Sequence, residues 1–360
     1  MQNKTLIAMS GGVDSSVAAH LLKQSGHDLT GAMMKLYNDD DISETHRNRG
    51  CCSLEDAEDA RAVASTLGIP FYVFNFTDTF AQQVMERFAL AYQQGKTPNP
   101  CIDCNRFMKF ERFIRRATEL ECNYISTGHY ARIEKSNERY LLKTGRDKTK
   151  DQSYVLYAMT QLQLSKTLLP LGELTKEEVR EIAENQGFVN AKKRDSQDIC
   201  FAPDGDYAGF IKRYNGSEIK KGNFICNKTN QPIGEHKGLI HYTIGQRKGL
   251  GLYSPNPLYV ISLNPEQNTV TVGTSEDLFS SCLTASDINL IPFDKLDGSL
   301  RVQAKIRFSH QPQPATLWQT GEDKIRVEFD APQRAITPGQ AVALYDGDVV
   351  IGGGTIEMAI

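Results

Sequence analysis

The segment that most constrains this chain is the glycine pair Gly11-Gly12, which stands between two apolar runs. The preceding run, Leu6–Met9, has the length of a buried strand, and the following run, Val17–Leu22, suits a helix. Serine hydroxyls flank the pair at Ser10, Ser15 and Ser16. Glycine lets the backbone approach an anion closely, and a helix N-terminus supplies N–H donors. This strand-to-helix turn therefore predicts a phosphate site.

The glycine spacing restricts which phosphate ligand the turn would hold. The turn lacks the lysine of a Gly-x-x-x-x-Gly-Lys-Ser/Thr loop, and its spacing differs from the dinucleotide fingerprint. Ser10-Gly-Gly-Val-Asp-Ser15 resembles instead the pyrophosphate loop of the ATP pyrophosphatases, which cleave ATP between its α- and β-phosphates. The alternative interpretation is a glycine-rich turn without a ligand.

Periodicity predicts an α/β fold in three parts. Strand and helix patterns alternate over residues 1–205, which predicts a doubly wound, mostly parallel sheet as the catalytic domain. Residues 206–268 are rich in Gly, Lys, Asn and Pro with short strand-like pieces, typical of a small mixed connecting domain. Over residues 269–360 apolar and polar residues alternate, which predicts a C-terminal antiparallel β-barrel.

Several local patterns give more detailed expectations. Helices are expected over residues 54–67, with Ser53 as the cap, and over residues 78–94 and 106–120. Residues 37–50 are polar and predict a mobile loop. Thr175-x-x-Glu178 is a capping box that opens another helix. In the barrel, one side of a strand is expected to carry Val302, Ala304, Ile306 and Phe308.

Composition limits the class of protein. No apolar run approaches the ~20 residues of a membrane span, and the N-terminus has no signal pattern, so we expect a cytoplasmic protein without a membrane partner. The net charge of −3 means that any nucleic-acid surface must be a local patch. The candidate patches are Arg106/Lys109/Arg112/Arg115/Arg116, Lys192-Lys193-Arg194, Lys212-Arg213 with Lys220-Lys221, Arg247-Lys248, and Arg301/Lys305/Arg307.

The cysteines indicate thiol chemistry or metal binding. There are 8 of them without a secretory signal, so a disulfide scaffold is not expected. Cys101-x-x-Cys104 is predicted in a proline-stiffened loop just before a helix, and Cys200 follows the basic run Lys192–Arg194. Both surroundings favour thiolates. A zinc site is the alternative, but it needs four ligands, and Cys51-Cys52 have the wrong spacing for a second Cys-x-x-Cys pair.

An ordered series of motifs now identifies a family. The motifs are Ser10-Gly-Gly-Val-Asp-Ser15, Met34-Lys35, Thr97-Pro-Asn-Pro100 with Cys104-Asn105, Thr127-Gly-His-Tyr130, Lys150-Asp-Gln-Ser-Tyr154, Ile199-Cys200-Phe201, Thr243-Ile-Gly-Gln-Arg-Lys-Gly-Leu-Gly251 and Thr337-Pro-Gly-Gln340. In this order they resemble the tRNA-specific 2-thiouridylases (MnmA family). The resemblance covers the chain from residue 5 nearly to its C-terminus.

The resemblance implies sulfur transfer to carbon 2 of the wobble uridine of tRNA. ATP with Mg²⁺ would activate the uracil carbonyl as an adenylate, and a cysteine persulfide would then supply the sulfur. AMP would leave, and two cysteines would end as a disulfide bond. The partners implied are tRNA and a sulfur-donor protein, either a cysteine desulfurase or a relay carrier.

Matching positions give each site residue an implied role. The ATP site would comprise Ala8, Met9, Ser10, Gly11, Gly12, Val13, Asp14, Ser15, Met34 and Gly128, with Asp14 near the magnesium-bound pyrophosphate. Cys104 matches the nucleophile and Cys200 the persulfide carrier. The tRNA contacts would be Asn99, Pro100 and Cys101, which face the target base, together with His129, Lys150, Asp151, Gln152, Arg307, Phe308 and Gln340.

One position departs from the family pattern. Some members have Asp, proposed as an acid or base, where this chain has Cys101. Three roles are open to Cys101, namely proton exchange by its own thiol, a regulatory disulfide with Cys104, or ligation of an iron–sulfur cluster together with Cys104 and Cys200. Cys51 and Cys52, in the predicted mobile loop, are either spectators or ligands. Two other functions stay open, a ligase of the same superfamily with another acceptor, and a non-catalytic tRNA-binding or iron–sulfur carrier protein.

Overall fold

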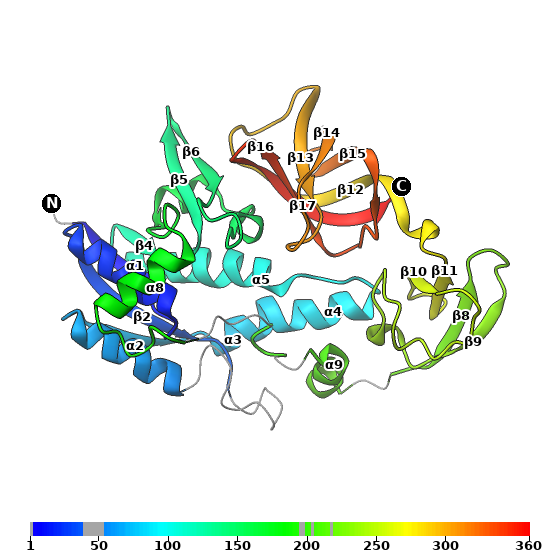
Figure 1. Cartoon of the computed structure of the whole chain (residues 1–360), viewed down its shortest axis with the longest axis horizontal. Coiled ribbons are helices and arrows are strands. Elements are labelled where there is room, and N and C mark those ends of the chain that lie inside the picture. The colour runs from blue at the N-terminus through cyan, green and yellow to red at the C-terminus, as the bar shows by residue number, and fades with distance from the viewer. Residues whose placement is uncertain (1–2, 39–53, 194–198, 203–204, 217–218) are drawn as a thin grey trace. The chain divides into compact units, whose positions relative to one another are not determined.

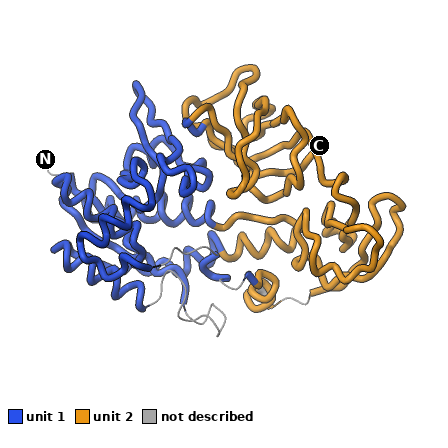
Figure 2. Tube along the Cα trace, viewed as in Figure 1, with its two compact units in different colours: residues 1–84, 101–205, 348–350 blue, residues 85–100, 206–347, 351–360 orange. Residues whose placement is uncertain are grey.

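The computed structural model describes residues 3–38, 54–193, 199–202, 205–216 and 219–360. Contacts group the chain into two compact units, which Figure 2 distinguishes by colour. The first unit comprises residues 1–84, 101–205 and 348–350, and the second comprises residues 85–100, 206–347 and 351–360. Most of the predicted mobile loop, the cap at Ser53, Cys51-Cys52 and Arg194 lie outside the described residues. The division at residues 205 and 268 stays a prediction.

A parallel sheet forms the centre of the first unit (Figure 1). Its strands within the described residues are β1 (Lys4–Ala8), β2 (Asp28–Lys35), β3 (Phe71–Asn75), β4 (Tyr124–Ser126) and β7 (Thr167–Leu168). The order is β3-β2-β1-β4-β7, and each neighbouring pair is parallel. The predicted doubly wound sheet is confirmed, with β1 at its middle.

Helices cover both faces of this sheet. The helices of the first unit in the described ranges are α1 (Val13–Gln24), α2 (Leu54–Thr66), α3 (Thr77–Phe80), α5 (Pro100–Asp103), the π-helix η4 (Cys104–Arg112), α6 (Phe113–Glu119), the 3₁₀-helix η5 (Ser153–Leu156), α7 (Gln161–Ser165) and α8 (Lys176–Asn185). Val17 of α1, Val63 of α2 and Val179 of α8 share one buried cluster. On β3 the opposite side carries Phe74, whose ring lies 6.4 Å from that of Phe113 in α6.

The first unit also contains an antiparallel hairpin that periodicity did not predict. Its strands are β5 (Ala131–Ser136) and β6 (Arg139–Thr144), and its turn places Asn137 at φ 54°. Residues 348–350 group with this hairpin, because the Thr144 N–H donates to the carbonyl oxygen of Asp348 at 2.8 Å. The hairpin strands are short and mostly half-buried, so their apolar pattern is weak.

The helix expected over residues 78–94 is confirmed, with a π-helical segment inside it. It comprises α3, the π-helix η3 (Ala81–Glu86) and α4 (Arg87–Gln93). In the second unit α4 packs against α9 (Tyr207–Asn215), where the Phe88 ring lies 5.8 Å from Tyr207 and 6.0 Å from Phe210. Aromatic contacts therefore join α4 to a helix more than a hundred residues later in the chain.

A mixed sheet follows in the second unit, together with the 3₁₀-helix η6 (Leu239–His241). Its strands are β8 (Gly222–Cys226), β9 (Pro232–His236), β10 (Tyr259–Asn264) and β11 (Thr269–Gly273), in the order β10-β11-β8-β9. The β11–β8 pair is parallel and the others are antiparallel. Alternation grouped Thr269–Gly273 with the barrel, but this strand belongs to the mixed sheet. A two-residue period identifies a strand without showing which sheet it joins.

The C-terminal strands form the predicted antiparallel barrel. They are β12 (Phe279–Leu290), preceded by the 3₁₀-helix η7 (Glu276–Leu278), and β13 (Ser299–Lys305), β14 (Gln313–Gly321), β15 (Lys324–Arg334), β16 (Ala341–Asp346) and β17 (Val349–Ala359). They pair in the order β12-β15-β14-β13-β16-β17, and β12 pairs with β17 to close the ring. Val302, Ala304 and Ile306 are buried as expected, whereas Phe308 is 48% exposed because β13 ends at Lys305.

Candidate functional site

The pyrophosphate loop lies at the carboxyl end of the middle strand. Strand β1 ends at Ala8 and helix α1 begins at Val13, so Met9–Gly12 forms the turn between them. Met34 lies in β2, two residues beyond Ala32, which is the register partner of Ala8. Ligands of open α/β sheets bind at this edge, outside the carboxyl ends of the strands. The predicted ATP residues of the loop and Met34 thus share one edge.

Gly11 makes the loop too tight for any side chain. Its φ is +76°, and a Cβ atom on it would lie 2.3 Å from the backbone oxygen of Asp56 in α2. At the helix start, Gly12 is the N-cap residue, so no side chain caps the first N–H groups of α1. A backbone cradle below an uncapped helix N-terminus fits the phosphates of ATP.

Hydroxyl groups and a buried amide hold the loop in shape. The Ser10 N–H donates to Ser15 Oγ at 3.2 Å, and the Ser15 and Ser16 hydroxyls both donate to the carbonyl oxygen of Gly12. Asn190, only 2% exposed, donates from Nδ2 to the Gly11 carbonyl oxygen and to Ser16 Oγ, both at 2.9 Å. Sequence reasoning missed Asn190, which lies 179 positions from Gly11.

Asp14, in the first turn of α1, is surrounded by groups from distant parts of the chain. Lys176 Nζ lies 2.8 and 2.9 Å from its two carboxylate oxygens, and the Tyr130 hydroxyl donates to Oδ1 at 2.7 Å. A Cβ atom on Gly128 would lie 2.9 Å from the backbone of Asp14 and Ser15. The structure thus brings the predicted residue Gly128 to the loop and adds Lys176 and Tyr130. Tyr130 closes the Thr127–Tyr130 motif, but neither residue had been assigned a role.

Cys101 and Cys104 lie in a helix, which corrects the expectation of a loop reaching Asn105. The helix begins at Pro100 with α5 and continues as the π-helix η4 from Cys104. Proline is favoured at the first position of a helix because its missing N–H is not needed there, and the preceding Asn99 is a residue type that favours helix caps. Cys101 is exposed and Cys104 is partly buried. Cys101 therefore sits in the first turn, where the helix dipole favours negative charge, and Cys104 lies one turn further along the helix.

Cys200 is partly buried and is anchored through its neighbour. Phe201 is 1% exposed, and its ring lies 5.9 Å from that of Phe80 in α3, a helix that also packs against η4. The structure shows no disulfide bond among the cysteines in the described ranges. Within those ranges, it also shows no group of three His, Cys, Asp or Glu side chains able to hold a metal ion.

His129 is buried rather than displayed on the surface. It is 6% exposed, and its Nδ1 lies 2.7 Å from Thr127 Oγ1 while its Nε2 lies 3.4 Å from Lys109 Nζ. Burial, and then the Lys109 ammonium, hold the pKa of His129 well below its usual range. The ring is therefore neutral at pH 7, and because lysine can only donate, Nδ1 carries the proton.

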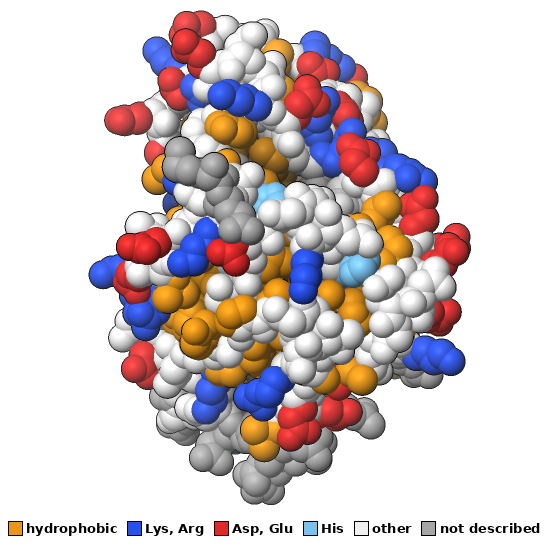
Figure 3. Space-filling model, turned by 90° about the vertical axis from the view of Figure 1, so that its left-hand side faces the viewer, with side chains coloured by type: hydrophobic (Ala, Val, Ile, Leu, Met, Phe, Trp, Pro, Cys, Tyr) orange, Lys and Arg blue, Asp and Glu red, His pale blue; other side chains and the backbone are white. Residues whose placement is uncertain are grey.

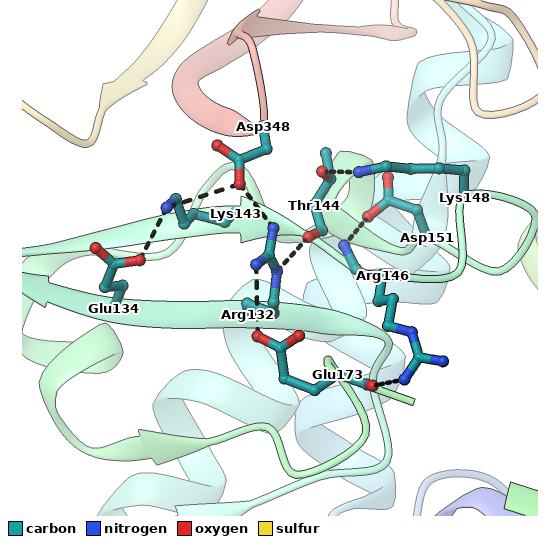
Figure 4. Close-up of polar contacts among 10 residues, drawn as sticks. Arg132, Glu134, Lys143, Thr144, Arg146, Lys148, Asp151, Glu173 and Asp348 are labelled. Atoms are coloured by element: carbon teal, nitrogen blue, oxygen red, sulfur yellow. Dashed lines mark hydrogen bonds and ion pairs between the residues drawn. The ribbon is translucent and has the colours of Figure 1, made fainter. Parts of the chain in front are cut away.

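Asp151 and Gln152 both accept hydrogen bonds from other residues of the first unit. Asp151 accepts a hydrogen bond from the Gly145 N–H at 2.9 Å (Figure 4). It also accepts one from the Ser153 hydroxyl at 2.7 Å. Gln152 Oε1 accepts from the Tyr130 N–H at 3.0 Å, and the Gln152 N–H donates to the Tyr130 carbonyl oxygen. In Figure 4 Arg132 and Lys143 of the nearby hairpin both reach Asp348. Lys150, next to Asp151, is half-buried.

In the second unit, Gln340 holds the segment before the cysteine helix. Its Nε2 donates to the Thr97 carbonyl oxygen at 2.7 Å, and the Thr97 N–H donates to the Pro338 carbonyl oxygen at 2.9 Å. Arg307 donates to the carbonyl oxygen of Ala335 and to Thr337 Oγ1. These two predicted tRNA residues therefore make internal contacts in this unit.

The candidate basic patches are partly neutralised by acidic neighbours. Lys193 lies 2.7 Å from Asp56 and 2.6 Å from Asp59, and Arg301 lies 2.7 Å from Asp330. On the face shown in Figure 3, basic and acidic side chains are interspersed around an apolar area. A run of basic residues in the sequence shows only their own charges, whereas the fold also shows the acidic residues that pair with them.

No helix in the described ranges has the combination of length and apolarity that a membrane span requires.

Comparison with known proteins matches every part of the chain. Residues 3–204 match a family described as the tRNA methyl transferase HUP domain, residues 208–274 the tRNA methyl transferase PRC-barrel domain, and residues 280–356 the aminomethyltransferase β-barrel domain. A tRNA-specific 2-thiouridylase MnmA of Clostridioides difficile is 52% identical over 100% of this chain and 99% of its own.

Similar proteins of the same name extend the match. The tRNA-specific 2-thiouridylase MnmA of Lachnoclostridium phytofermentans is 49% identical over 98% of this chain and 99% of its own, and that of Clostridium kluyveri is 48% identical over 99% and 100%. Identity at this level over the full length of both proteins establishes common membership. The chain belongs to the tRNA-specific 2-thiouridylase (MnmA) family.

Proposed function

We propose that this chain replaces the oxygen on carbon 2 of the wobble uridine in tRNA with sulfur, and that it uses ATP to activate that oxygen. The observation that carries the proposal is the full-length match to tRNA-specific 2-thiouridylases, of which the Clostridioides difficile protein is 52% identical to this chain. The reaction needs reduced thiols, so the protein works in the cytoplasm.

The pyrophosphate loop serves the activation step. The uracil carbonyl oxygen attacks the α-phosphate of ATP, which forms an O–P bond and releases pyrophosphate. The backbone of Ser10–Gly12 and the first N–H groups of α1 face that leaving group and stabilise its charge. Mg²⁺ that arrives bound to the phosphates would neutralise part of their charge near Asp14. Support comes from the cradle at Gly11, which a Cβ atom would fill.

Cys200 and Cys104 serve the sulfur step. A donor protein, a cysteine desulfurase or a relay carrier, places a sulfur atom on Cys200 as a persulfide. The terminal sulfur attacks carbon 2 of the adenylated base, and AMP leaves with the oxygen. The Cys104 thiolate then attacks Cys200 Sγ, which breaks the S–S bond, leaves the outer sulfur on the base and forms a Cys104–Cys200 disulfide. A cellular thiol reduces that disulfide before the next turnover.

Cys101 faces the target base together with Asn99 and Pro100 in this proposal. Its exposure and its place in the first helical turn favour a thiolate that exchanges protons with the base. An iron–sulfur cluster on Cys101, Cys104 and Cys200 is the competing hypothesis. Anaerobically purified protein with bound iron and broad visible absorption would favour the cluster, while thiolation by iron-free, persulfide-loaded protein would exclude it.

The remaining tRNA contacts follow from exposure and charge. Phe308 is 48% exposed, and Lys305 Nζ lies 5.5 Å from the centre of its ring. An exposed ring beside a cation suits a nucleotide, with the base on the ring and the phosphate near the ammonium. The other proposed tRNA contacts are His129, Lys150–Gln152, Arg307 and Gln340. Because His129 is buried, it would contact tRNA through Lys109.

Nucleoside mass spectrometry tests the function in cells. A strain without the gene should lose 2-thiouridine from its tRNA, and the wild-type gene should restore it. Cys104→Ser and Cys200→Ser should fail to restore it, while Cys226→Ser, a substitution in β8 of the mixed sheet, should succeed. Normal 2-thiouridine in the deletion strain would refute the function, and normal thiolation by both serine variants would refute the mechanism.

A further inference from the structure

The pyrophosphate loop carries a charge opposite to the one that its ligand requires. From Ala8 to Ser16 its charged side chain is the carboxylate of Asp14, which stands in the first turn of the helix that would receive phosphate. A carboxylate beside a triphosphate repels it, and the loop lacks the lysine that other phosphate loops place at this point. Apart from the Mg²⁺ that would arrive with the phosphates, a group elsewhere in the chain has to offset the charge of Asp14.

Helix α8 brings a lysine to this carboxylate from 162 positions away. Lys176 is the first residue of the helix, and its Nζ lies 2.8 Å from Asp14 Oδ1 and 2.9 Å from Oδ2. The Lys176 residue is 8% exposed, so its ammonium is largely out of water. A buried ammonium is costly without a partner, which makes this pair a built feature of the site.

The backbone at Lys176 is fixed by two independent sets of hydrogen bonds. The capping box of α8 joins the Thr175 hydroxyl to the Glu178 N–H at 3.3 Å and the Glu178 carboxylate to the Thr175 N–H at 2.7 Å. The Lys176 N–H donates to Asp147 Oδ2 at 3.1 Å. The lysine side chain therefore starts from a defined point beside the loop.

Tyr130 fixes the carboxylate from a second direction. Its hydroxyl donates to Asp14 Oδ1 at 2.7 Å, and its ring centre lies 5.9 Å from Lys176 Nζ, within the range of a cation–π contact. Reciprocal hydrogen bonds with Gln152 hold the Tyr130 backbone. Lys176 and Tyr130, neither of which had an assigned role, thus both contact the Asp14 carboxylate.

We propose that Lys176 is a positioning residue of the ATP site, which neutralises Asp14 so that the loop accepts a polyphosphate. Lys176 supplies from α8 the positive charge that the loop itself lacks, and Tyr130 keeps the carboxylate against it. The inference rests on the proposed assignment of the loop to ATP. It concerns binding, so it is tested without tRNA, without a sulfur donor and without turnover.

A double-mutant cycle on ATP affinity tests the proposal. Calorimetric titration with an ATP analogue that carries a methylene group between the α- and β-phosphates measures binding to the full-length protein with Mg²⁺. Lys176→Met should weaken binding by about tenfold or more, because it leaves Asp14 uncompensated. Lys176→Arg should stay near the wild type. In a parallel titration without Mg²⁺, where repulsion by Asp14 acts alone, Asp14→Asn combined with Lys176→Met should bind more tightly than Lys176→Met alone. Lys295→Met, in an exposed ion pair of the barrel, is the matched control.

A second measurement covers the case in which Lys176→Met does not fold. With Mg²⁺ removed by chelation, Asp14→Asn should bind the analogue more tightly than the wild type, because Lys176 then faces the phosphates without its counter-charge. Wild-type affinity in Lys176→Met, a double variant weaker than Lys176→Met, or no gain for Asp14→Asn under chelation would each overturn the proposal. If the wild-type protein bound the ATP analogue but did not thiolate tRNA, the proposed function would be refuted and this inference would stand.

Discussion

Replacing Gly11 by alanine should damage both the stability of the first unit and its affinity for ATP. The substitution puts a Cβ atom at φ +76° and 2.3 Å from the backbone oxygen of Asp56, with the Asp56 Cα and carbonyl carbon at 2.8 and 2.9 Å. The left-handed conformation costs alanine about 1–2 kcal/mol, part of which a stiffer unfolded chain offsets. The contact is with backbone, so α2 or the loop has to move, at a cost of about 1–3 kcal/mol.

Gly26→Ala is the matched control for this prediction, since Gly26 follows the other end of α1. Its φ is +83°, and nothing lies within 4 Å of the added Cβ atom, so it carries the conformational cost without the collision. We expect a loss of about 1 kcal/mol for Gly26→Ala and of about 2–4 kcal/mol for Gly11→Ala.

Chemical denaturation measures the stability of the two variants, and calorimetry with the methylene ATP analogue measures their affinity. Gly11→Ala should bind the analogue at least about tenfold more weakly than the wild type, and Gly26→Ala should bind it normally. Equal stability losses for the two variants, with ATP affinity unchanged in both, would refute the argument that the loop is held against α2 as a cradle for phosphate.

Two further predictions concern contacts outside the loop. Gln340→Leu removes the hydrogen bond to the Thr97 carbonyl oxygen, so it should lower the free energy of unfolding by about 1 kcal/mol without changing ATP affinity. The control Gln311→Leu, at an exposed position, should change neither quantity. Unchanged stability in Gln340→Leu would show that the bond contributes nothing. The pKa of His129 is lowered by burial, so protons bind the unfolded state preferentially below about pH 6.5. Stability should therefore fall as the pH drops from about 6.5 to 5, and His129→Gln should reduce that fall in a pH series of unfolding curves; an identical slope in both proteins would contradict the buried neutral ring.

Short-range patterns predicted the parts of the structure that they themselves determine. The apolar run before Gly11 is β1, the residues after Gly12 are α1, and the Thr175–Glu178 box opens α8 as expected. Each of these depends on residues only a few positions apart, which a sequence displays directly. Alternation in Val302–Ile306 likewise identified the buried face of a barrel strand.

The features that escaped prediction depend on contacts between distant residues. In the sequence Lys176 is an ordinary helix residue, and only the fold shows that its Nζ lies 2.8 Å from Asp14. Likewise, only the fold shows that Asn190 donates hydrogen bonds to Gly11 and Ser16. The sequence predicts too late a start for the cysteine helix, because prolines are common both in stiff loops and at the first position of helices, and Pro100 opens the helix. Phe308 continued an alternating pattern beyond the end of its strand.

Single-turnover thiolation by purified, persulfide-loaded protein tests the central claim most directly. The protein is freed of iron, loaded with one persulfide, and mixed with ATP, Mg²⁺ and tRNA that lacks the modification. The account predicts equal amounts of 2-thiouridine, AMP and pyrophosphate, with a Cys104–Cys200 disulfide found by peptide mass spectrometry. Formation of 2-thiouridine without AMP, or its absence unless iron is restored, would contradict the account.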